Sequence, residues 1–381
     1  MVTHRGPLRR ALRGRPGAKR SVQDPNVVAA GLLYDMAALQ TNERSALGYK
    51  RAAKAVIALP ASLADIIRAK ALREVPFIGP ASGRILTEFA ESGRSPTVEA
   101  AVAASPRQTD IATRRLLRAN FLSQHGMTEV LAAGFPARVV SRSTFRGDLQ
   151  MHTSWSDGAE SIDAMIGACR ALGHTCMGVT DHSYGLPIAR GMAMDAALRQ
   201  HREIDELNSR YAGQFRVFKG IEANILADGS LDLQADERTA FEFVIAAPHA
   251  LLRRAEDQTI RMLAAVRAAG VAILGHPRGR VFNTRAGVAA DWPRVFAAAA
   301  ERGVAIELDG NWHRQDLDWE LAAAALAEGC IFALDSDAHS IPELRFTEYA
   351  IAHARLAHIP AERVINCWEN DRLERWMNDR S

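Results

Sequence analysis

The arrangement of apolar and polar positions divides the chain into two regions. Up to about residue 143, apolar residues recur at helical spacing, as in Val27, Leu32, Met36 and Leu39, and no alternating strand-like run occurs. Beyond residue 143, short β-rich runs alternate with helical stretches. This change in pattern predicts an N-terminal all-α region followed by an α/β domain.

The α/β region contains seven β-rich runs. They are predicted at residues 145–150, 176–180, 215–221, 243–248, 271–275, 304–308 and 331–335. Helical stretches separate most of them, at residues 161–172, 196–211, 256–268, 291–302, 317–328 and 343–357. This alternation favours parallel strands with crossover helices, and seven such units favour a barrel related to the TIM type. An open doubly wound sheet is the alternative, although no glycine-rich dinucleotide motif follows the first run.

Composition and cysteine usage limit the class of protein. Apolar residues make up 48% of the chain and charged residues 24%, which is ordinary for a globular protein. The apolar stretches are short and interrupted by charged residues or glycine, so no segment is predicted to span a membrane. The four cysteines form no CxxC pair and suggest no disulfide framework, which favours a reducing, cytoplasmic location.

The first 25 residues are predicted to form a basic, disordered tail. The first twenty contain seven basic residues and no acidic one, and they lack the apolar core of a secretory signal. Such a tail is either a solvated segment or an arm that strengthens nucleic-acid binding through its charge.

Polar side chains follow the end of every predicted strand. In chain order they are Gln150, His152, Asp157, Asp181, His182, Glu222, His249, His276, Glu307, Asp309, Asp337 and His339. A single histidine after an apolar strand is more often a packing residue, but the carboxyl ends of parallel barrel strands meet on one face. Imidazoles and carboxylates crowded there would be costly to bury unless cations compensated. The pattern therefore predicts a site for divalent metals, and its nitrogen and oxygen donors suit Zn, Mn or Fe.

A multi-metal site of this kind predicts hydrolysis of phosphate esters. Bound metals lower the pKa of a water molecule to roughly 7 and clamp both oxygens of an in-line phosphoryl displacement. No G-x-S-x-G motif is present, so we expect a metal-activated water and no protein nucleophile. Arg190, Arg278 and Arg280 lie just beyond strand ends and suit phosphate binding, with ordinary surface ion pairs as the alternative. Asp181 and Glu307 are expected to orient metal ligands.

These motifs resemble the PHP (polymerase and histidinol phosphatase) family, in the family's order, over residues 145 to about 357. The resemblance implies a distorted seven-stranded barrel with three divalent metals. The first metal would be held by Gln150, His152, Glu222 and Asp337, the second by Glu222, His249 and His276, and the third by Asp157, His182 and His339. Gln150 stands where the family usually has histidine, and its amide oxygen is a weaker, neutral donor.

A closer resemblance is to the PHP domain of bacterial family X DNA polymerases. It rests on GDLQMHTSWSDG, GIEANILADGSLD, ILGHPRGR and ALDSDAHS. Residues 26–102 resemble the helical domain of that family, and residues 74–85 resemble its helix-hairpin-helix. Gly79, Gly83 and Arg84 would then contact a DNA phosphate, although Phe77 replaces the hairpin's usual first glycine. Only a helical connector, residues 103–143, separates this domain from the PHP domain at 144–381, so the polymerase core is missing.

Three functions remain open at this point. The first is a metal-dependent phosphoesterase acting on DNA 3′ ends, as a 3′–5′ exonuclease or a 3′-phosphatase in DNA repair. The second is a phosphatase of a small phosphorylated metabolite, similar to histidinol phosphatase. The third is a DNA-binding scaffold with weak or no catalysis. The sequence does not identify protein partners.

Overall fold

The computed structural model describes residues 23–379, which form two compact units. One unit contains Gly134–Arg280 and continues from Ala286, and the other ends at Ala133 and includes Val281–Arg285. The predicted basic tail lies almost wholly outside the described residues. No helix within residues 23–379 is long and apolar enough to cross a membrane.

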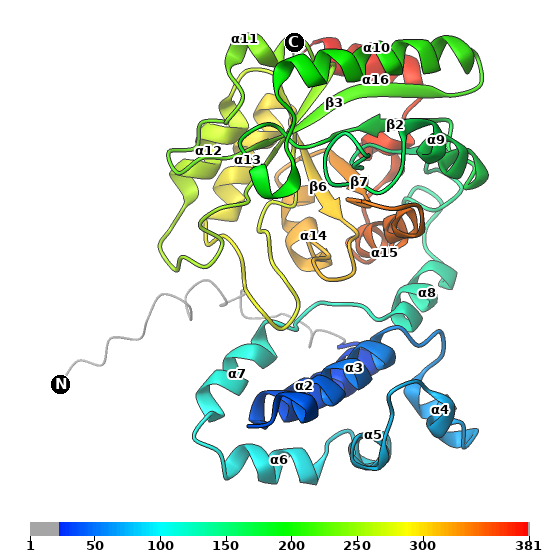
Figure 1. The fold of residues 1–381 in the computed structure, drawn as a ribbon, viewed down its shortest axis with the longest axis vertical. Helices are drawn as coiled ribbons and strands as arrows, with labels where there is room; N and C mark the ends of the chain where they lie inside the picture. Colours follow the sequence, from blue (N-terminus) through cyan, green and yellow to red (C-terminus); the bar gives the residue numbers. More distant parts are fainter. Residues whose placement is uncertain (1–22, 380–381) are drawn as a thin grey trace, which may run out of the picture. The chain divides into compact units, whose positions relative to one another are not determined.

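The larger unit is built around seven parallel strands, which confirms the predicted barrel (Figure 1). The strands are β1 Gly147–Asp148, β2 Cys176–Val179, β3 Arg216–Asn224, β4 Phe243–Ala247, β5 Val271–Leu274, β6 Ala305–Asp309 and β7 Phe332–Asp335. They pair in chain order, and a parallel bridge between Met151 and Ala338 joins the first strand's extension to the last. Each strand overlaps one predicted run, and the doubly wound alternative is wrong.

Helices cover the outside of the barrel. The longer ones are α9 Ile162–Ala171, α10 Met194–Arg210, α12 Thr259–Arg267, α13 Trp292–Arg302, α14 Trp319–Ala327 and α15 Thr347–Leu356. Helix α9 packs on β2, α10 on β3, α12 on β5, and α15 on β6 and β7. The stretch predicted from residue 343 begins as a 3₁₀ helix, Ile341–Phe346, before α15. Two further helices were not predicted, the short α11 Ala235–Arg238 and the C-terminal α16 Asn370–Asn378.

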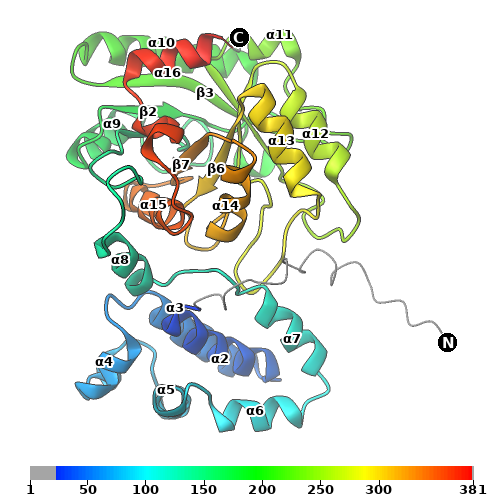
Figure 2. The same cartoon turned by 180° about the vertical axis from the view of Figure 1, so that it is seen from behind.

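The apolar core of the barrel lies toward the amino ends of its strands. Phe218, Phe243 and Ile273 are buried there together with Leu373 and Met377 of α16. Figure 2 shows α16, in red, at the upper end of the barrel unit beside α10. Helix α16 therefore packs against this end through its apolar side. The carboxyl ends of the strands are left for polar side chains.

The smaller unit is entirely helical, as predicted. Its helices are α2 Pro25–Leu39, α3 Glu43–Ile57, α4 Leu63–Arg68, α5 Pro80–Ser92, α6 Pro96–Ala103, α7 Gln108–Leu116 and α8 Gln124–Ala132. Helix α2 begins at Pro25 because the Asp24 side chain caps it, accepting from the backbone N–H groups of Asn26 and Val27. Its apolar side packs on α3. Most of the predicted connector, including α7 and α8, falls within this unit.

Candidate metal centre

Glu222 lies at the middle of the residues that end the barrel strands. Its carboxylate is fully buried, and imidazoles approach it from several sides. Oε2 lies 2.9 Å from Nδ1 of His182 and 3.4 Å from Nε2 of His152, while Oε1 lies 2.9 Å from Nε2 of His276 and 3.4 Å from Nε2 of His249. One carboxylate therefore faces four imidazoles contributed by four different strand ends.

Two further carboxylates complete the cluster. Asp337 Oδ1 lies 3.1 Å from Nε2 of His152. Asp157 Oδ1 lies 3.4 Å from Nε2 of His339 and 3.7 Å from Nε2 of His182. Three groups of side chains each bring their ligand atoms within 4.8 Å of one another: His152, Asp157, His182 and His339; His182, Glu222 and His249; and His152, Glu222 and Asp337.

Gln150 reaches the same cluster through its amide group. Its Nε2 lies 3.5 Å from Oδ1 of Asp337, and the side chain is fully buried. Its Oε1 has no hydrogen-bond partner. The structure thus brings all nine residues expected at the metal centre to one end of the barrel.

The donor set fits divalent cations. Three buried atoms that face the cluster, Nδ1 of His182, Oε1 of Gln150 and Oε2 of Glu222, have no hydrogen-bond partner. Such atoms are costly to bury unless a ligand satisfies them. Burial lowers the pKa of His152 and His249, which keeps these imidazoles neutral as metal ligands must be. Burial alone would raise the pKa of Glu222, but His182 and His249 hold it well below its usual range.

Positive charge is also favoured at the outer part of the cluster. Burial opposes protonation of His339, but Asp157 and Asp337 raise its pKa to about 10. Conversely, burial alone would raise the pKa of Asp157, but His339 lowers it to about 2. The raised pKa of His339 reports a negative field at this position, which favours a cation, and the lowered pKa of Asp157 reports its attraction to the histidines around it.

Two carboxylates outside the cluster hold its backbone in place. Asp181 accepts hydrogen bonds from the backbone N–H groups of Thr153 (2.8 Å) and Ser156 (3.1 Å), in the loop between His152 and Asp157. Glu307 accepts a hydrogen bond from the backbone N–H of His276. Asp181 thus holds the loop that connects two of the expected ligands, and Glu307 holds the backbone of a third.

Of the arginines near this end of the barrel, Arg314 contacts the cluster directly. No role was assigned to it from its position in the sequence, but its guanidinium donates to Asp337 and lies 3.4 Å from Oδ2 of Asp309. The guanidinium of Arg280 is buried and bonds Asp318 (3.0 Å) and the carbonyl of Gln315 (2.8 Å).

The other two arginines expected at phosphate lie on different loops at this end. Arg278 shares Asp318 with Arg280, at 3.3 Å, and its side chain is 22% exposed. Arg190 is exposed on the loop after β2. Arg314 lies five residues beyond β6, and no feature of the sequence distinguishes it from Arg190, Arg278 and Arg280.

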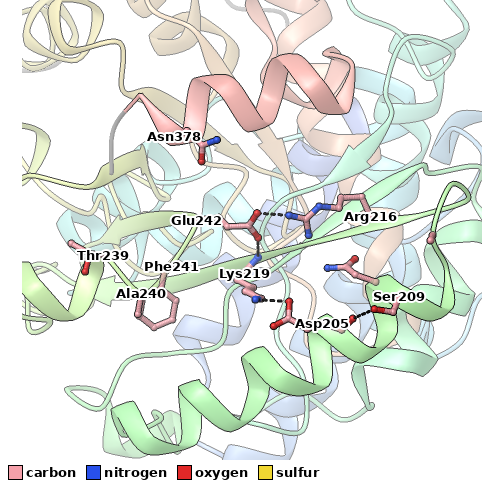
Figure 3. Close-up of a pocket in the computed structure, with 11 residues that line it drawn as sticks. Asp205, Ser209, Arg216, Lys219, Thr239, Ala240, Phe241, Glu242 and Asn378 are labelled. Atoms are coloured by element: carbon pink, nitrogen blue, oxygen red, sulfur yellow. Dashed lines mark hydrogen bonds and ion pairs between the residues drawn. The ribbon is translucent and has the colours of Figure 1, made fainter.

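A surface pocket of about 730 Å³ lies far from this cluster. It is formed by α10 and the amino ends of β3 and β4, opposite the strand ends that carry the ligands (Figure 3). Its charged groups are paired with one another: Lys219 Nζ lies 2.6 Å from Asp205 Oδ1, and Arg216 pairs with Glu242. The pocket therefore offers no group for phosphate chemistry.

The segment that resembles a helix-hairpin-helix in sequence lies between α4 and α5 and begins with a 3₁₀ helix, Leu72–Glu74. Within it Phe77 adopts a φ of 66°, the left-handed region that favours glycine. Gly79 caps α5, with open space beside its Cα. Arg84 is exposed on the first turns of α5, and Gly83 packs near Ile78.

The comparisons with known proteins agree with the barrel. The family model of the PHP domain matches residues 148–309. A segment of 229 residues, 60% of this chain, is 34% identical to the DNA polymerase/3′-5′ exonuclease PolX of Bacillus subtilis and covers 40% of that protein. This chain therefore spans well under half the length of that relative.

Other similar proteins are barrel-sized. A probable phosphatase of Edwardsiella ictaluri is 29% identical over 230 residues, which cover 58% of this chain and 89% of the phosphatase. The histidinol phosphate phosphatase of Lactococcus lactis, solved with zinc, L-histidinol and phosphate, aligns with a TM-score of 0.40 and 16% identity, covering 55% of this chain and 93% of that one. The motif order, the seven parallel strands and the family match lead to one conclusion: this chain contains a PHP domain.

Proposed function

We propose that this protein hydrolyses phosphate esters at DNA 3′ ends, as a 3′–5′ exonuclease or a 3′-phosphatase. The observation that carries the proposal is the buried cluster around Glu222, in a segment 34% identical to PolX. The exposed basic surface of the helical unit supports DNA as the substrate.

The nine clustered residues would hold the metals. Seven of them fall into the three groups whose ligand atoms lie within 4.8 Å of one another, and Gln150 and His276 adjoin these groups through Asp337 and Glu222. When bound, divalent cations would lower the pKa of a water molecule and neutralise charge on the phosphate. Mixed imidazole and carboxylate donors suit Zn, Mn or Fe. The chain's own contribution is to fix these donors, and Asp181 and Glu307 do so by holding the ligand loops.

Arg314 would orient the substrate phosphate. Its guanidinium already lies among the carboxylates Asp309 and Asp337, and both raise its pKa, so it remains charged. A guanidinium offers two parallel N–H donors to a phosphate, which fixes the phosphate's orientation as well as its charge. Arg190 and Arg278 would contact phosphates farther along the strand. For Arg280 we propose a supporting role, because its donors are bound to Asp318 and Gln315.

The helical unit would bind DNA without reading its sequence. Residues 43–94 contain nine basic and five acidic residues. Arg44, Leu47, Arg51 and Lys54 recur on one face of α3, and all four are exposed. Gly79, Gly83 and Arg84 would add a phosphate contact at the start of α5. Binding of this kind weakens steeply as the salt concentration rises.

A second candidate is a phosphatase of a small phosphorylated metabolite. The observation in its favour is that the barrel alone spans 89% of the probable phosphatase of Edwardsiella ictaluri. A PHP barrel without an added helical unit is therefore about as long as the whole of that phosphatase.

Hydrolysis of labelled DNA separates the two candidates. Mn-loaded wild-type protein would be incubated with 5′-labelled oligonucleotides that end in either a 3′-hydroxyl or a 3′-phosphate, and with small phosphomonoesters. We expect shortening of the strand or loss of its 3′-phosphate, and His249→Ala should reduce either by more than about 100-fold. His358→Asn is the matched control, because His358 is an exposed histidine just after α15 that is not among the clustered residues, and asparagine tolerates its left-handed backbone.

Turnover of small phosphomonoesters without any change to the oligonucleotides would replace the first candidate by the second. No hydrolysis of any phosphate ester by the metal-loaded protein would contradict both.

A further inference from the structure

Three exposed apolar side chains lie on loops next to the candidate metal centre. Ile188 is 91% exposed, and Tyr184 and Leu226 are 36% and 43% exposed. Tyr184 follows the ligand His182 by two residues, and Leu226 follows Glu222 by four. Single exposed apolar residues are ordinary, but a group of them beside an active site indicates a binding surface. We call these three residues the apolar rim.

The two loops that carry the rim are bonded to each other. Ser183 Oγ donates to Asp232 Oδ2 at 2.7 Å, and the backbone N–H of Asn224 donates to Asp232 Oδ1 at 2.9 Å. The loop after β2 also closes on itself, because the backbone N–H of Met192 donates to the carbonyl of His182 at 2.7 Å. The rim is therefore tied to a strand end that bears a ligand.

Close packing fixes the base of the loop that carries Ile188. A Cβ on Gly185 would lie 2.0 Å from Asp232 Oδ2, and one on Gly191 would lie 1.9 Å from the carbonyl oxygen of Ser183. Ala189 and Met192 are buried. Ile188 and Arg190 flank the buried Ala189 and are exposed, so the packed loop presents one apolar and one cationic side chain to solvent.

The length of this loop limits the distance from Ile188 to the centre. Ile188 lies four residues before Met192, and four residues span at most about 14 Å. Successive nucleotides of a stacked strand are about 3.4 Å apart. Ile188 is therefore within reach of the first few nucleotides beyond a phosphate held at the cluster. A compound of metabolite size has few apolar atoms to place there.

We propose that the apolar rim binds unpaired bases of a nucleic-acid strand whose 3′-terminal phosphate ester lies at the metal centre. Ile188 covers the face of a base, as apolar side chains do when they enter a base stack, and Arg190 contacts the strand's phosphates. This inference rests on the proposed function and adds a requirement to it. A base can cover the rim only when it has left its partner, so the site takes a single-stranded 3′ end.

The test is equilibrium binding of a short 5′-fluorescent single strand, measured by anisotropy with Mn. The full chain carries His249→Ala so that the strand is not consumed. Adding Ile188→Ala should weaken binding about tenfold, whereas adding Leu172→Ala should leave it unchanged. Leu172 is a suitable control because it is 46% exposed at the end of α9, before β2 begins. Thermal melting shows whether each variant is folded.

A second strand with abasic sites at its last three positions makes the test specific. If Ile188 contacts bases, Ile188→Ala should weaken binding of the abasic strand little, because the bases that the side chain would contact are already absent. Equal affinity of the Ile188→Ala and parent proteins for the normal strand would overturn the proposal. A tenfold loss that persists on the abasic strand would also overturn it.

The separate hydrolysis assay keeps the two proposals distinguishable. Binding that depends on Ile188 and on the bases, without any hydrolysis of 3′ ends, would support the rim and contradict the proposed function. Removal of 3′ nucleotides with binding indifferent to Ile188 would overturn the rim alone. No binding of the strand by the parent protein would overturn the rim, whatever the hydrolysis assay shows.

Discussion

The barrel region and the helical region use their charged residues in opposite ways. Residues 134–381 contain 34 acidic and 27 basic residues, whereas residues 23–133 contain 10 acidic and 13 basic ones. Many carboxylates of the barrel are fully buried: Asp148, Asp181, Glu222, Glu307, Asp309, Asp335 and Asp337. Within the described part of the helical unit the buried carboxylates are Asp24 and Asp35.

The two regions also differ in how buried charge is compensated. Asp24 accepts from Ser123, and Asp35 pairs with Arg115 and Arg118 at 2.7 Å each, so the helical unit balances its buried carboxylates internally. At the strand ends of the barrel, imidazoles and carboxylates keep unsatisfied atoms. Such an arrangement is costly without added cations. The barrel therefore keeps buried polar atoms that added cations would satisfy, whereas the helical unit pairs its buried carboxylates and exposes basic side chains on α3.

Apart from the metal ligands themselves, the largest expected effect concerns Arg314, which contacts the cluster. Arg314→Ala should lower kcat/KM for phosphate esters by about 10- to 100-fold, because a charge-assisted hydrogen bond to phosphate is lost. Metal content, measured by mass spectrometry, should stay unchanged. Arg302→Ala, at the end of α13, is the control. Unchanged kcat/KM in Arg314→Ala would assign Arg314 a purely structural role.

Removing the basic side chains of α3 tests whether the helical unit holds DNA. Replacing Arg44, Arg51 and Lys54 together by glutamine should weaken DNA binding at low salt by about tenfold and flatten its salt dependence. Hydrolysis of a small phosphomonoester should not change. If DNA binding were unaffected, the helical unit would not be the part that holds DNA.

A smaller effect is expected at Gln150, where an amide replaces the family's usual histidine. Gln150→His should tighten metal binding several-fold, because a neutral imidazole is a stronger donor than an amide oxygen. Metal titration of the chelator-treated protein measures this change. Weaker metal binding in Gln150→His would indicate that the cluster is shaped for the amide.

The smallest expected effect is on acid stability of the barrel. Burial lowers the pKa of His353 to about 3 and of His174 and His201 to about 4, whereas unfolded histidine titrates near 6.5. The unfolded chain thus binds more protons, and stability should fall as pH decreases from about 6.5 toward 4.

His353→Gln tests this dependence, with chelator present so that metal ligands do not contribute. The variant should melt lower at pH 7.5 but lose about 2–4 °C less than wild type between pH 6.5 and 4.5. An identical slope in both proteins would exclude His353 as a source of the acid sensitivity.

The sequence predicted the barrel well because its signals are local. Each strand is a short apolar run, and each ends in a polar residue that the parallel arrangement brings to one face. Helix α16 was missed because the alternation of strands and helices had already ended. The pattern also gave no sign that Arg115 and Arg118 of the predicted connector pair with Asp35, a residue about 80 positions away.

The contacts at the site that could not be predicted from the sequence depend on how the loops fold. Arg314 meets Asp337 only because the loop after β6 folds back, with the carbonyl of Gln315 held by Arg280. Arg280 itself looked like a phosphate ligand from its position after β5, yet it is buried beside Asp318. The positions of the strands can be predicted from local patterns in the sequence, whereas these contacts join loops that are distant in the sequence.

The most direct test of the central claim measures metal content and hydrolysis in the same samples. Wild type and Glu222→Gln would be reconstituted with Mn, and bound metal per chain and hydrolysis of phosphate esters would be determined together. Because Glu222 faces four imidazoles, its neutralisation should reduce both quantities, with hydrolysis falling by more than about 100-fold. Full hydrolysis by Glu222→Gln, or hydrolysis by wild type without bound metal, would contradict the account.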